Sequence, residues 1–291
     1  GIHTILSKAE RNGRIARRNG TTMEIIEQYI TPKSKTTETE DGIVITDDFV
    51  AVIDGSTSKS PVRIAAGCSN GRYCMTLIAG FVRRADAYIG VEEFCNGLTA
   101  TIRDRYRGLD MRRLEEHPEE RLTASCIVYS RHQRQIWMIG HCQCLVDGQL
   151  YENPKPCEAV IAEKRAAIIH SLIADGKATV DSLRTNDTAR QAVIPELIET
   201  MRGQNHDYAV VDGFPIPMEH VRIINLTPAP HSIVLASDGY PFLLPTLTES
   251  EAALRRQLAE DPLNAYTFKA TKAFAKGNNS FDDRTYVRFR T

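Results

Sequence analysis

Residues 42–55, GIVITDDFVAVIDG, decide how this chain begins to fold. Two β-branched, apolar stretches flank the polar pair Asp47-Asp48, a pattern typical of a hairpin whose turn lies at the two aspartates. The second stretch ends at Asp54-Gly55, where glycine lets the chain leave a sheet sharply. The segment therefore predicts an antiparallel strand pair that ends in a carboxylate.

The residues beyond this hairpin alternate between helical and strand periodicity. Apolar residues recur three and four positions apart over 71–88 and 91–106, which predicts two amphipathic helices. Strand patterns return at 122–129 and 135–146, and a turn follows at Asp147-Gly148. The second half predicts helices ending at Ala174, over 189–201 and over 248–275, and strands at 207–213, 221–226, 232–236 and 284–289.

Short turns join most of the consecutive strands, which favours antiparallel sheets over a doubly wound parallel sheet. We therefore expect an α+β fold with two sheets and helices packed outside them. No Pro/Gly/Ser-rich linker divides the chain. We expect an N-terminal extension or first helix at 1–30, and a single domain over 31–291 that carries a helical insert at about 157–203.

Composition excludes several classes of partner. The chain has 291 residues and a formal net charge of -1, so it lacks the electrostatic footprint of a nucleic-acid or anionic-membrane binder. A basic run at 11–18 reads as a solvated helix face or frayed terminus. No apolar run approaches the roughly 20 residues of a membrane span. Seven irregularly spaced cysteines without C-x-x-C predict a reducing, cytoplasmic location. Oligomeric state stays open.

Three apolar strand patterns end in Asp-Gly, at Asp54, Asp212 and Asp238, and a further acidic pair stands at Asp282-Asp283. Carboxylates at the ends of buried strands can converge on one hard cation, and magnesium and manganese prefer oxygen ligands. Asp-Gly is, however, first of all a turn signal, and six such pairs occur in the chain. Spacing alone therefore does not establish a metal site.

The ordered set of motifs is more specific. It resembles the successive motifs of protein phosphatase 2C-like serine/threonine phosphatases, over about residue 36 to the end. The matching segments are TETEDGIVITDDFVAVIDGST, RLTASCIVY, QIWMIGHCQCLVDGQL, SIVLASDGYPFL and SFDDRTYV. The resemblance implies a four-layer α-β-β-α sandwich of two antiparallel sheets flanked by helices, with a two-metal site in a cleft at one end.

The resemblance also implies a set of site residues. Asp54 would bridge both metals, the carbonyl of Gly55 would bind one of them, and Asp238 and Asp282 would hold the other. Two Mn²⁺ or Mg²⁺ ions are the expected cofactors. Asp54 and Asp238 are the central catalytic residues, because the metals they hold would activate the water that attacks phosphorus.

Four other acidic residues are placed less centrally. Glu40 and Asp41 match the acidic pair of the family before its first strand, and would bind metal directly or through water. Asp283 stands beside the last ligand and is a secondary candidate. Asp212 matches no metal motif of the family, so we interpret it as a turn residue.

The chain departs from the family at Gly140-His141-Cys142, where the family has G-D-S. Since that Asp contributes to a third metal in many bacterial members, His141 puts the third metal in doubt and is itself a secondary candidate. On a continuous strand, His141 and Gln143 would face one way and Cys142 and Cys144 the other. We therefore do not expect a tetrahedral zinc site here.

A second departure concerns phosphate binding. The phosphate-binding Arg of the family falls on Thr36 in this chain, and Lys35 and Lys33 are the nearby cations. A lysine supplies charge without the bidentate fork of a guanidinium. We therefore expect weak phosphate binding by Lys35 and Lys33.

The function predicted from these residues is a metal-dependent phosphoprotein (serine/threonine) phosphatase that hydrolyses phosphate monoesters. Phosphoprotein is the expected partner, and no nucleic acid or membrane is expected. Two alternatives stay open. Thr36 and His141 suit a catalytically silent, phosphatase-like binding domain, and an insert that narrows the cleft would suit small phosphate esters.

Overall fold

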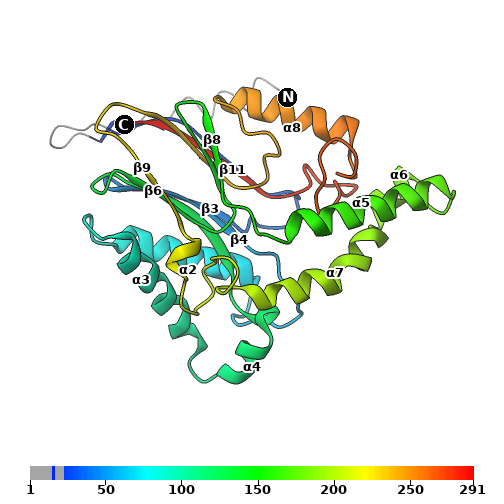
Figure 1. Cartoon of the computed structure of the whole chain (residues 1–291), viewed down its shortest axis with the longest axis horizontal. Coiled ribbons are helices and arrows are strands. Elements are labelled where there is room, and N and C mark those ends of the chain that lie inside the picture. The colour runs from blue at the N-terminus through cyan, green and yellow to red at the C-terminus, as the bar shows by residue number, and fades with distance from the viewer. Residues whose placement is uncertain (1–14, 17–22) are drawn as a thin grey trace.

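Two antiparallel sheets pack face to face at the centre of the molecule, in a computed structural model that describes residues 15–16 and 23–291 (Figure 1). The five-stranded sheet has the order β3 (Asp41–Ile45), β4 (Phe49–Gly55), β5 (Ala124–Ser130), β6 (Gln135–Ile139) and β9 (Arg222–Asn225). The six-stranded sheet has the order β1 (Ile15–Ala16), β2 (Met23–Thr31), β11 (Arg284–Arg290), β10 (Ser232–Ala236), β7 (Gln143–Val146) and β8 (Gln149–Glu152).

Strand β4 is buried on both faces, and its alternation positions the first functional carboxylate. Phe49 and Ala51 join the core beneath the helices, whereas Val50 and Val52 join the core between the two sheets. Side chains alternate along a strand, so Asp54 lies on the same face as Val50 and Val52. The sequence of β4 therefore directs Asp54 towards the six-stranded sheet.

Helices cover the outer face of each sheet, which confirms the expected α-β-β-α sandwich (Figure 1). Helices α2 (Asn70–Arg84) and α3 (Val91–Arg103) pack on the five-stranded sheet. Helix α8 (Leu247–Glu260) lies over the six-stranded sheet. The remaining short helices are α4 (Met111–Glu116) and the 3₁₀ turns Asp104–Tyr106, Pro118–Glu120, Met201–Gly203 and Met218–His220.

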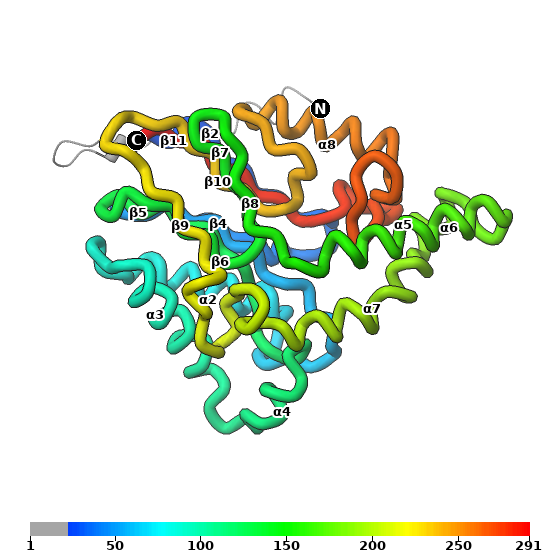
Figure 2. Tube along the Cα trace, viewed as in Figure 1, coloured from blue at the N-terminus to red at the C-terminus, as the bar shows by residue number. Residues whose placement is uncertain are grey.

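Three helices stand where the helical insert is expected. These are α5 (Glu158–Ala174), α6 (Val180–Thr185) and α7 (Thr188–Thr200). Figure 2 shows α5 and α7 running outward together from one end of the sandwich, with α6 at their far end. Helices α5 and α7 pack through an apolar cluster of Ile161, Val193 and Leu197.

The expectation for residues 1–30 is wrong over its last part, because residues 23–31 form strand β2. Met23 and Ile25 alternate into the core between the sheets, and β2 pairs along β11. The expected extension or first helix at 1–30 does not allow for this strand. Residues 1–14 and 17–22, which carry the basic side chains of the run 11–18, lie outside the described residues.

Three other expectations need correction. Residues 135–146 form two strands in different sheets, because Gly140 adopts a φ of 100° and the chain crosses over there. The helix predicted over 248–275 ends at Glu260, before Asp261-Pro262. A residue that precedes proline disfavours the α conformation, and Asp261 leaves the helical region with a φ of -141°. Residues 207–213 form no strand beyond two isolated bridges, Val211 with Ala124 and Tyr208 with Gln204.

None of the helices in the described ranges, 15–16 and 23–291, has the length and hydrophobicity that a bilayer crossing requires.

Candidate active site

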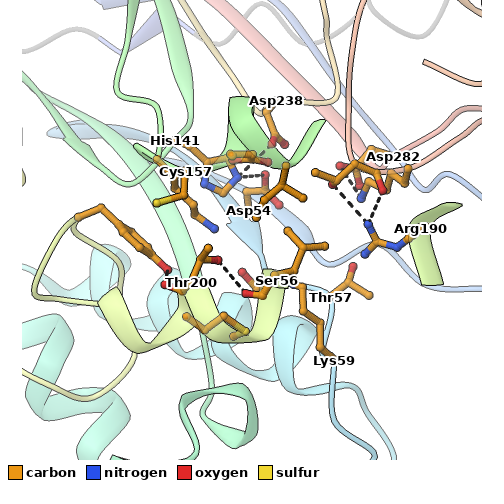
Figure 3. Close-up of a pocket in the computed structure, with 18 of the residues that line it drawn as sticks. Asp54, Ser56, Thr57, Lys59, His141, Cys157, Arg190, Thr200, Asp238 and Asp282 are labelled. Carbon is orange, nitrogen blue, oxygen red and sulfur yellow. Dashed lines mark hydrogen bonds and ion pairs between the residues drawn. The ribbon is translucent and has the colours of Figure 1, made fainter. Parts of the chain in front are cut away.

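Two Asp-Gly strand ends from different sheets meet at one end of the sandwich. Asp54 is the penultimate residue of β4 in the five-stranded sheet, and Asp238 follows β10 in the six-stranded sheet. Both line a cavity of about 120 Å³, together with Asp282 from the loop before β11. Three of the carboxylates predicted from the sequence therefore line one cavity (Figure 3).

The glycines after these aspartates are required by close packing. A Cβ atom at Gly55 would collide with the carbonyl oxygen of Gly71 at the start of α2, and one at Gly239 would collide with the carbonyl oxygen of Asp283. The Gly55 amide also donates to the carbonyl of Glu40 over 3.0 Å. The Asp-Gly pattern thus reflects the crowding of backbone around the site, beyond its role as a turn signal.

His141 lies between the two aspartates (Figure 3). Its Nε2 atom is 3.0 Å from Oδ2 of Asp238 and 3.6 Å from Oδ2 of Asp54. Its Nδ1 atom is 3.0 Å from Oγ of Ser125 on β5, which fixes the orientation of the ring. The crossover at Gly140 is what turns His141 into this position.

Burial and charge repulsion perturb the two aspartates in opposite directions. Burial, followed by the charges of Asp238 and Asp41, raises the pKa of Asp54 well above its ordinary value. Burial acts in the same direction on Asp238, but the charge and hydrogen bond of His141 outweigh it and lower the pKa of Asp238. Asp238 thus keeps its charge through His141, whereas the charged form of Asp54 is disfavoured.

Asp282 is already paired within the chain. Its Oδ2 atom lies 2.9 Å from Nζ of Lys272, and its Oδ1 atom accepts the Asp283 amide over 2.9 Å. Burial lowers the pKa of Lys272, but the charge of Asp282 outweighs this and raises it overall. An ammonium group thus occupies the Asp282 side of the cavity.

The acidic pair before β4 lies behind the cavity. Asp41 is the cross-strand partner of Asp54, and its Oδ2 atom accepts from Oγ1 of Thr285 over 2.7 Å. Burial raises the pKa of Asp41 to about 7. Glu40 accepts hydrogen bonds from the hydroxyls of Thr57 and Ser69, each over 2.8 Å. Neither carboxylate lines the cavity, so any role in metal binding would act through Asp54 or through water.

The secondary candidates Asp283, Lys33 and Lys35 also lie off the cavity wall. Asp283 accepts the backbone amides of Lys33 and Glu40 over 2.9 and 2.8 Å, so it joins the segment before β3 to the loop before β11. Lys35 is exposed. Neither lysine lines the cavity, although the charge of Lys33 acts on Asp282, and phosphate binding by Lys33 and Lys35 stays a prediction.

Four basic side chains that belong to no motif identified in the sequence also line the cavity: Lys59, Lys155, Arg190 and Lys272. Lys59 lies four residues after Asp54-Gly55, which is the one signal that could have drawn attention to it. The other three come from the insert region and the loop before β11. Their convergence depends on tertiary packing.

Asp212, Cys142 and Cys144 are buried within the fold. Asp212 is fully buried and pairs with Arg121 over 2.9 Å, and its own carboxylate accepts the Phe214 amide as in an Asx turn. Cys142 and Cys144 lie in the core between the sheets, and burial raises the pKa of both thiols. After the crossover at Gly140, the side chains of Cys142 and Cys144 enter this core, whereas His141 lines the cavity.

The residues at the centre of the cavity fit one divalent cation. One ligand atom each from Asp54, His141 and Asp238 lies within 4.8 Å of the others, among the residues that the structure describes. Two carboxylates and one imidazole suit manganese, iron or zinc better than an all-oxygen set would. The raised pKa of Asp54 has the sign expected where a cation would relieve repulsion.

Solved structures similar to this chain include several bacterial phosphatases. They include the serine/threonine phosphatase Stp1 from Staphylococcus aureus, 14% identical with a TM-score of 0.46, covering 96% of this chain and 99% of that one. The chain resembles serine/threonine phosphatases of the 2C class. The Mycobacterium tuberculosis phosphatase PstP/Ppp is 14% identical with a TM-score of 0.43, covering 92% of this chain and 97% of that one.

RsbX in complex with magnesium is 13% identical with a TM-score of 0.42, covering 95% of this chain and 99% of that one. No protein-family model matches the chain, and no curated protein sequence matches it. At these identities the chemistry has to be argued from the residues of this chain itself.

Proposed function

We propose that the chain is a metal-dependent phosphatase that hydrolyses phosphate monoesters, with phosphoserine or phosphothreonine in proteins as its substrates. One observation carries the proposal: Asp54, His141 and Asp238 converge at the floor of a cavity that basic side chains also line. The sequence motifs that resemble 2C-like phosphatases support the same assignment.

Asp54 and Asp238, with His141, would hold a Mn²⁺ or Mg²⁺ ion. When bound, the ion would supply activation of a water molecule and neutralisation of charge on the phosphoryl oxygens. Ser125 orients the imidazole, and Asp41 packs behind Asp54, so both act on the position of the ligands.

Further ligands are proposed on position alone. The Gly55 carbonyl stays a proposed ligand because Gly55 lines the cavity. Asp282 is the proposed ligand of a second ion, which would require Lys272 to leave its carboxylate. Glu40 and Asp41 are proposed to act through water or by positioning. In the arrangement observed, one ion fits more readily than two.

Small phosphate esters are a second candidate class of substrate. Insert residues Glu158, Ile161, Arg190, Leu197 and Thr200 form part of the cavity wall. A wall built this far over the carboxylates limits the size of the group attached to the phosphate. The comparison of a phosphopeptide with a small ester decides between the two classes.

The test is turnover of para-nitrophenyl phosphate with Mn²⁺, Mg²⁺ or EDTA, for the wild type and for Asp54→Asn and Asp238→Asn. We expect metal-dependent turnover and a loss of roughly a hundredfold or more in each variant. Asp175→Asn is the matched control, because Asp175-Gly176 is an exposed Asp-Gly pair at the end of α5. An inert wild type that also fails to bind Mn²⁺ in calorimetry would overturn the proposal.

A further inference from the structure

Four basic side chains from four separate segments surround the mouth of the cavity. They come from the loop after β4, the connection between β8 and α5, helix α7, and the loop before β11, and are Lys59, Lys155, Arg190 and Lys272. Like charges so close together cost free energy unless counter-charges lie among them. The partners of each cation therefore show whether its positive charge is already balanced within the chain.

Two of the four cations are engaged within the chain. Lys272 pairs with Asp282 over 2.9 Å. Arg190 donates from one guanidinium nitrogen to the carbonyl and hydroxyl of Thr271, over 2.8 and 3.3 Å, and Figure 3 shows it beside Asp282. These contacts fix helix α7 against the loop before β11 and hold both cations at the cavity.

The other two cations, Lys59 and Lys155, make no ion pair within the described residues, although the charge of Glu158 acts on Lys59. Within residues 15–16 and 23–291, Lys59 makes no hydrogen bond or ion pair. Lys155 contacts only the ring face of Tyr208, with Nζ 5.4 Å from the ring centroid. Both side chains are partly exposed and line the cavity, so bulk water solvates them incompletely.

The electrostatics of Lys59 agree with this geometry. Burial, followed by the charges of Lys155, Arg190 and Lys272, lowers the pKa of Lys59 to about 7. A lysine whose charge is opposed in this way gains from any anion that enters the cavity. The wall thus favours a negatively charged ligand.

We propose that Lys59 and Lys155, beside Arg190, form the binding site for the phosphate group of a monoester. This wall takes the place of the arginine that is absent at Thr36. The inference deepens the proposed function and rests on it for the choice of a phosphate ester as ligand.

Counted with every lining side chain in its ordinary charge state, the cavity favours a dianion once one divalent cation is bound. Its four acidic lining residues equal its four basic ones in formal charge; the acidic set is Asp54, Glu158, Asp238 and Asp282. One divalent cation then leaves two positive charges, which a phosphate monoester dianion neutralises. The apolar side chains that complete the wall, Ile161, Leu197 and Met201, would face the organic group.

The experiment measures binding of radiolabelled inorganic phosphate by equilibrium dialysis, with Mg²⁺ present. The proteins are the wild type, Lys59→Gln, Lys155→Gln and the double variant. Each single change removes one charge-assisted hydrogen bond, so we expect roughly tenfold weaker binding in each and weaker binding still in the double variant. Lys177→Gln, an exposed lysine of the insert, is the matched control and should bind as the wild type does.

Competition then distinguishes the source of the phosphate group. A phosphoserine peptide and free phosphoserine each displace the label if they reach the wall, and their relative strength ranks peptide against small ester. Loss of competition by both ligands in the double variant is the expected result. Thermal melting of every variant checks that weaker binding is not caused by unfolding.

Unchanged phosphate affinity in both lysine variants would overturn the inference, and so would a wild type that binds no phosphate. Because dialysis needs no turnover, this failure is separable from failure of the proposed function. An inert protein that binds phosphate through Lys59 and Lys155 would contradict the proposed phosphatase activity but support the phosphate-binding site. An active enzyme whose variants keep the wild-type KM and phosphate affinity refutes the wall but keeps the phosphatase.

Discussion

Asp238 and Asp212 carry the same local signal, an apolar segment that ends in Asp-Gly, and meet opposite environments. Asp212 is surrounded by donors: Arg121 and Gln204 hold one oxygen over 2.9 and 3.0 Å, and Asn205 holds the other over 2.7 Å. Asp238 has His141 at 3.0 Å and faces Asp54. One carboxylate is held by three donors within the chain, whereas the other has a single imidazole partner and stands beside a second carboxylate.

The difference shows what separates a structural carboxylate from a functional one. A buried charge that is fully paired holds the fold together, and its removal leaves the partner unpaired. A carboxylate whose pKa is raised by burial and by a neighbouring charge, as for Asp54 beside Asp238, reduces stability and is retained where a ligand uses it. The variants below separate the two cases, beginning with the largest expected effect.

Asp212→Asn should break the fold rather than the site. It leaves the Arg121 guanidinium buried without its counter-charge, which costs about 3–5 kcal/mol. Urea unfolding of the variant measures this directly. Metal affinity of the folded fraction should stay at the wild-type level, and a weaker affinity there would mean that Asp212 contributes to the site.

His141→Asp should change which metal is preferred. An imidazole nitrogen suits manganese, whereas a carboxylate oxygen suits magnesium. We expect the ratio of Mn²⁺ to Mg²⁺ affinity, measured by calorimetry, to fall roughly tenfold in the variant. Ser125→Ala, which only releases the ring, should weaken both metals alike. An unaltered ratio in His141→Asp would show that the imidazole is not a ligand.

Asp54→Asn should stabilise the metal-free protein while it abolishes turnover. Burial and the charge of Asp238 raise the pKa of Asp54, so removing the charge relieves repulsion. A gain on the order of 1 kcal/mol in the free energy of unfolding is expected in EDTA at pH 8. A loss of stability in EDTA would place Asp54 in the same class as Asp212.

The smallest effect concerns pH and Lys59. Burial and the facing charges of Lys155, Arg190 and Lys272 lower the pKa of Lys59 to about 7, while Glu158, which also faces it, acts in the opposite direction. Anion binding needs the protonated amine, so affinity is full below pH 7 and falls above it. Sulfate, which stays a dianion, should bind about fivefold more weakly at pH 8 than at pH 6. Lys59→Gln should lack this step, and a step of equal size in that variant would assign it to another group.

The sandwich and its central carboxylates could be predicted because their signals are local. The alternation of β4 and the Asp-Gly pairs at Asp54 and Asp238 are readable from a few residues each. The crossover also has a local signal, because glycine inside a strand pattern often indicates a break, although the strand expected over 135–146 takes no account of Gly140. Its consequence, that His141 turns towards the carboxylates, needed the relative position of both sheets.

The cationic wall could not be predicted from the sequence. Lys155 and Arg190 reach the cavity because α5 and α7 pack against each other at the end of the sandwich. No periodicity sets that packing in relation to a motif a hundred residues away. The pairing of Asp212 with Arg121, 91 residues apart, is hidden for the same reason.

The origin of Asp54 and Asp238 in different sheets also has a mechanical consequence. A ligand held by both aspartates would join the two layers at this end, as a crosslink would, in addition to the apolar core and the Thr285–Asp41 hydrogen bond between the sheets. Separating the layers there requires release of the ligand, so occupancy adds to the free energy of that local opening by mass action. Amide hydrogen exchange at the ends of β4 and β10 would thus report the metal content of the protein directly.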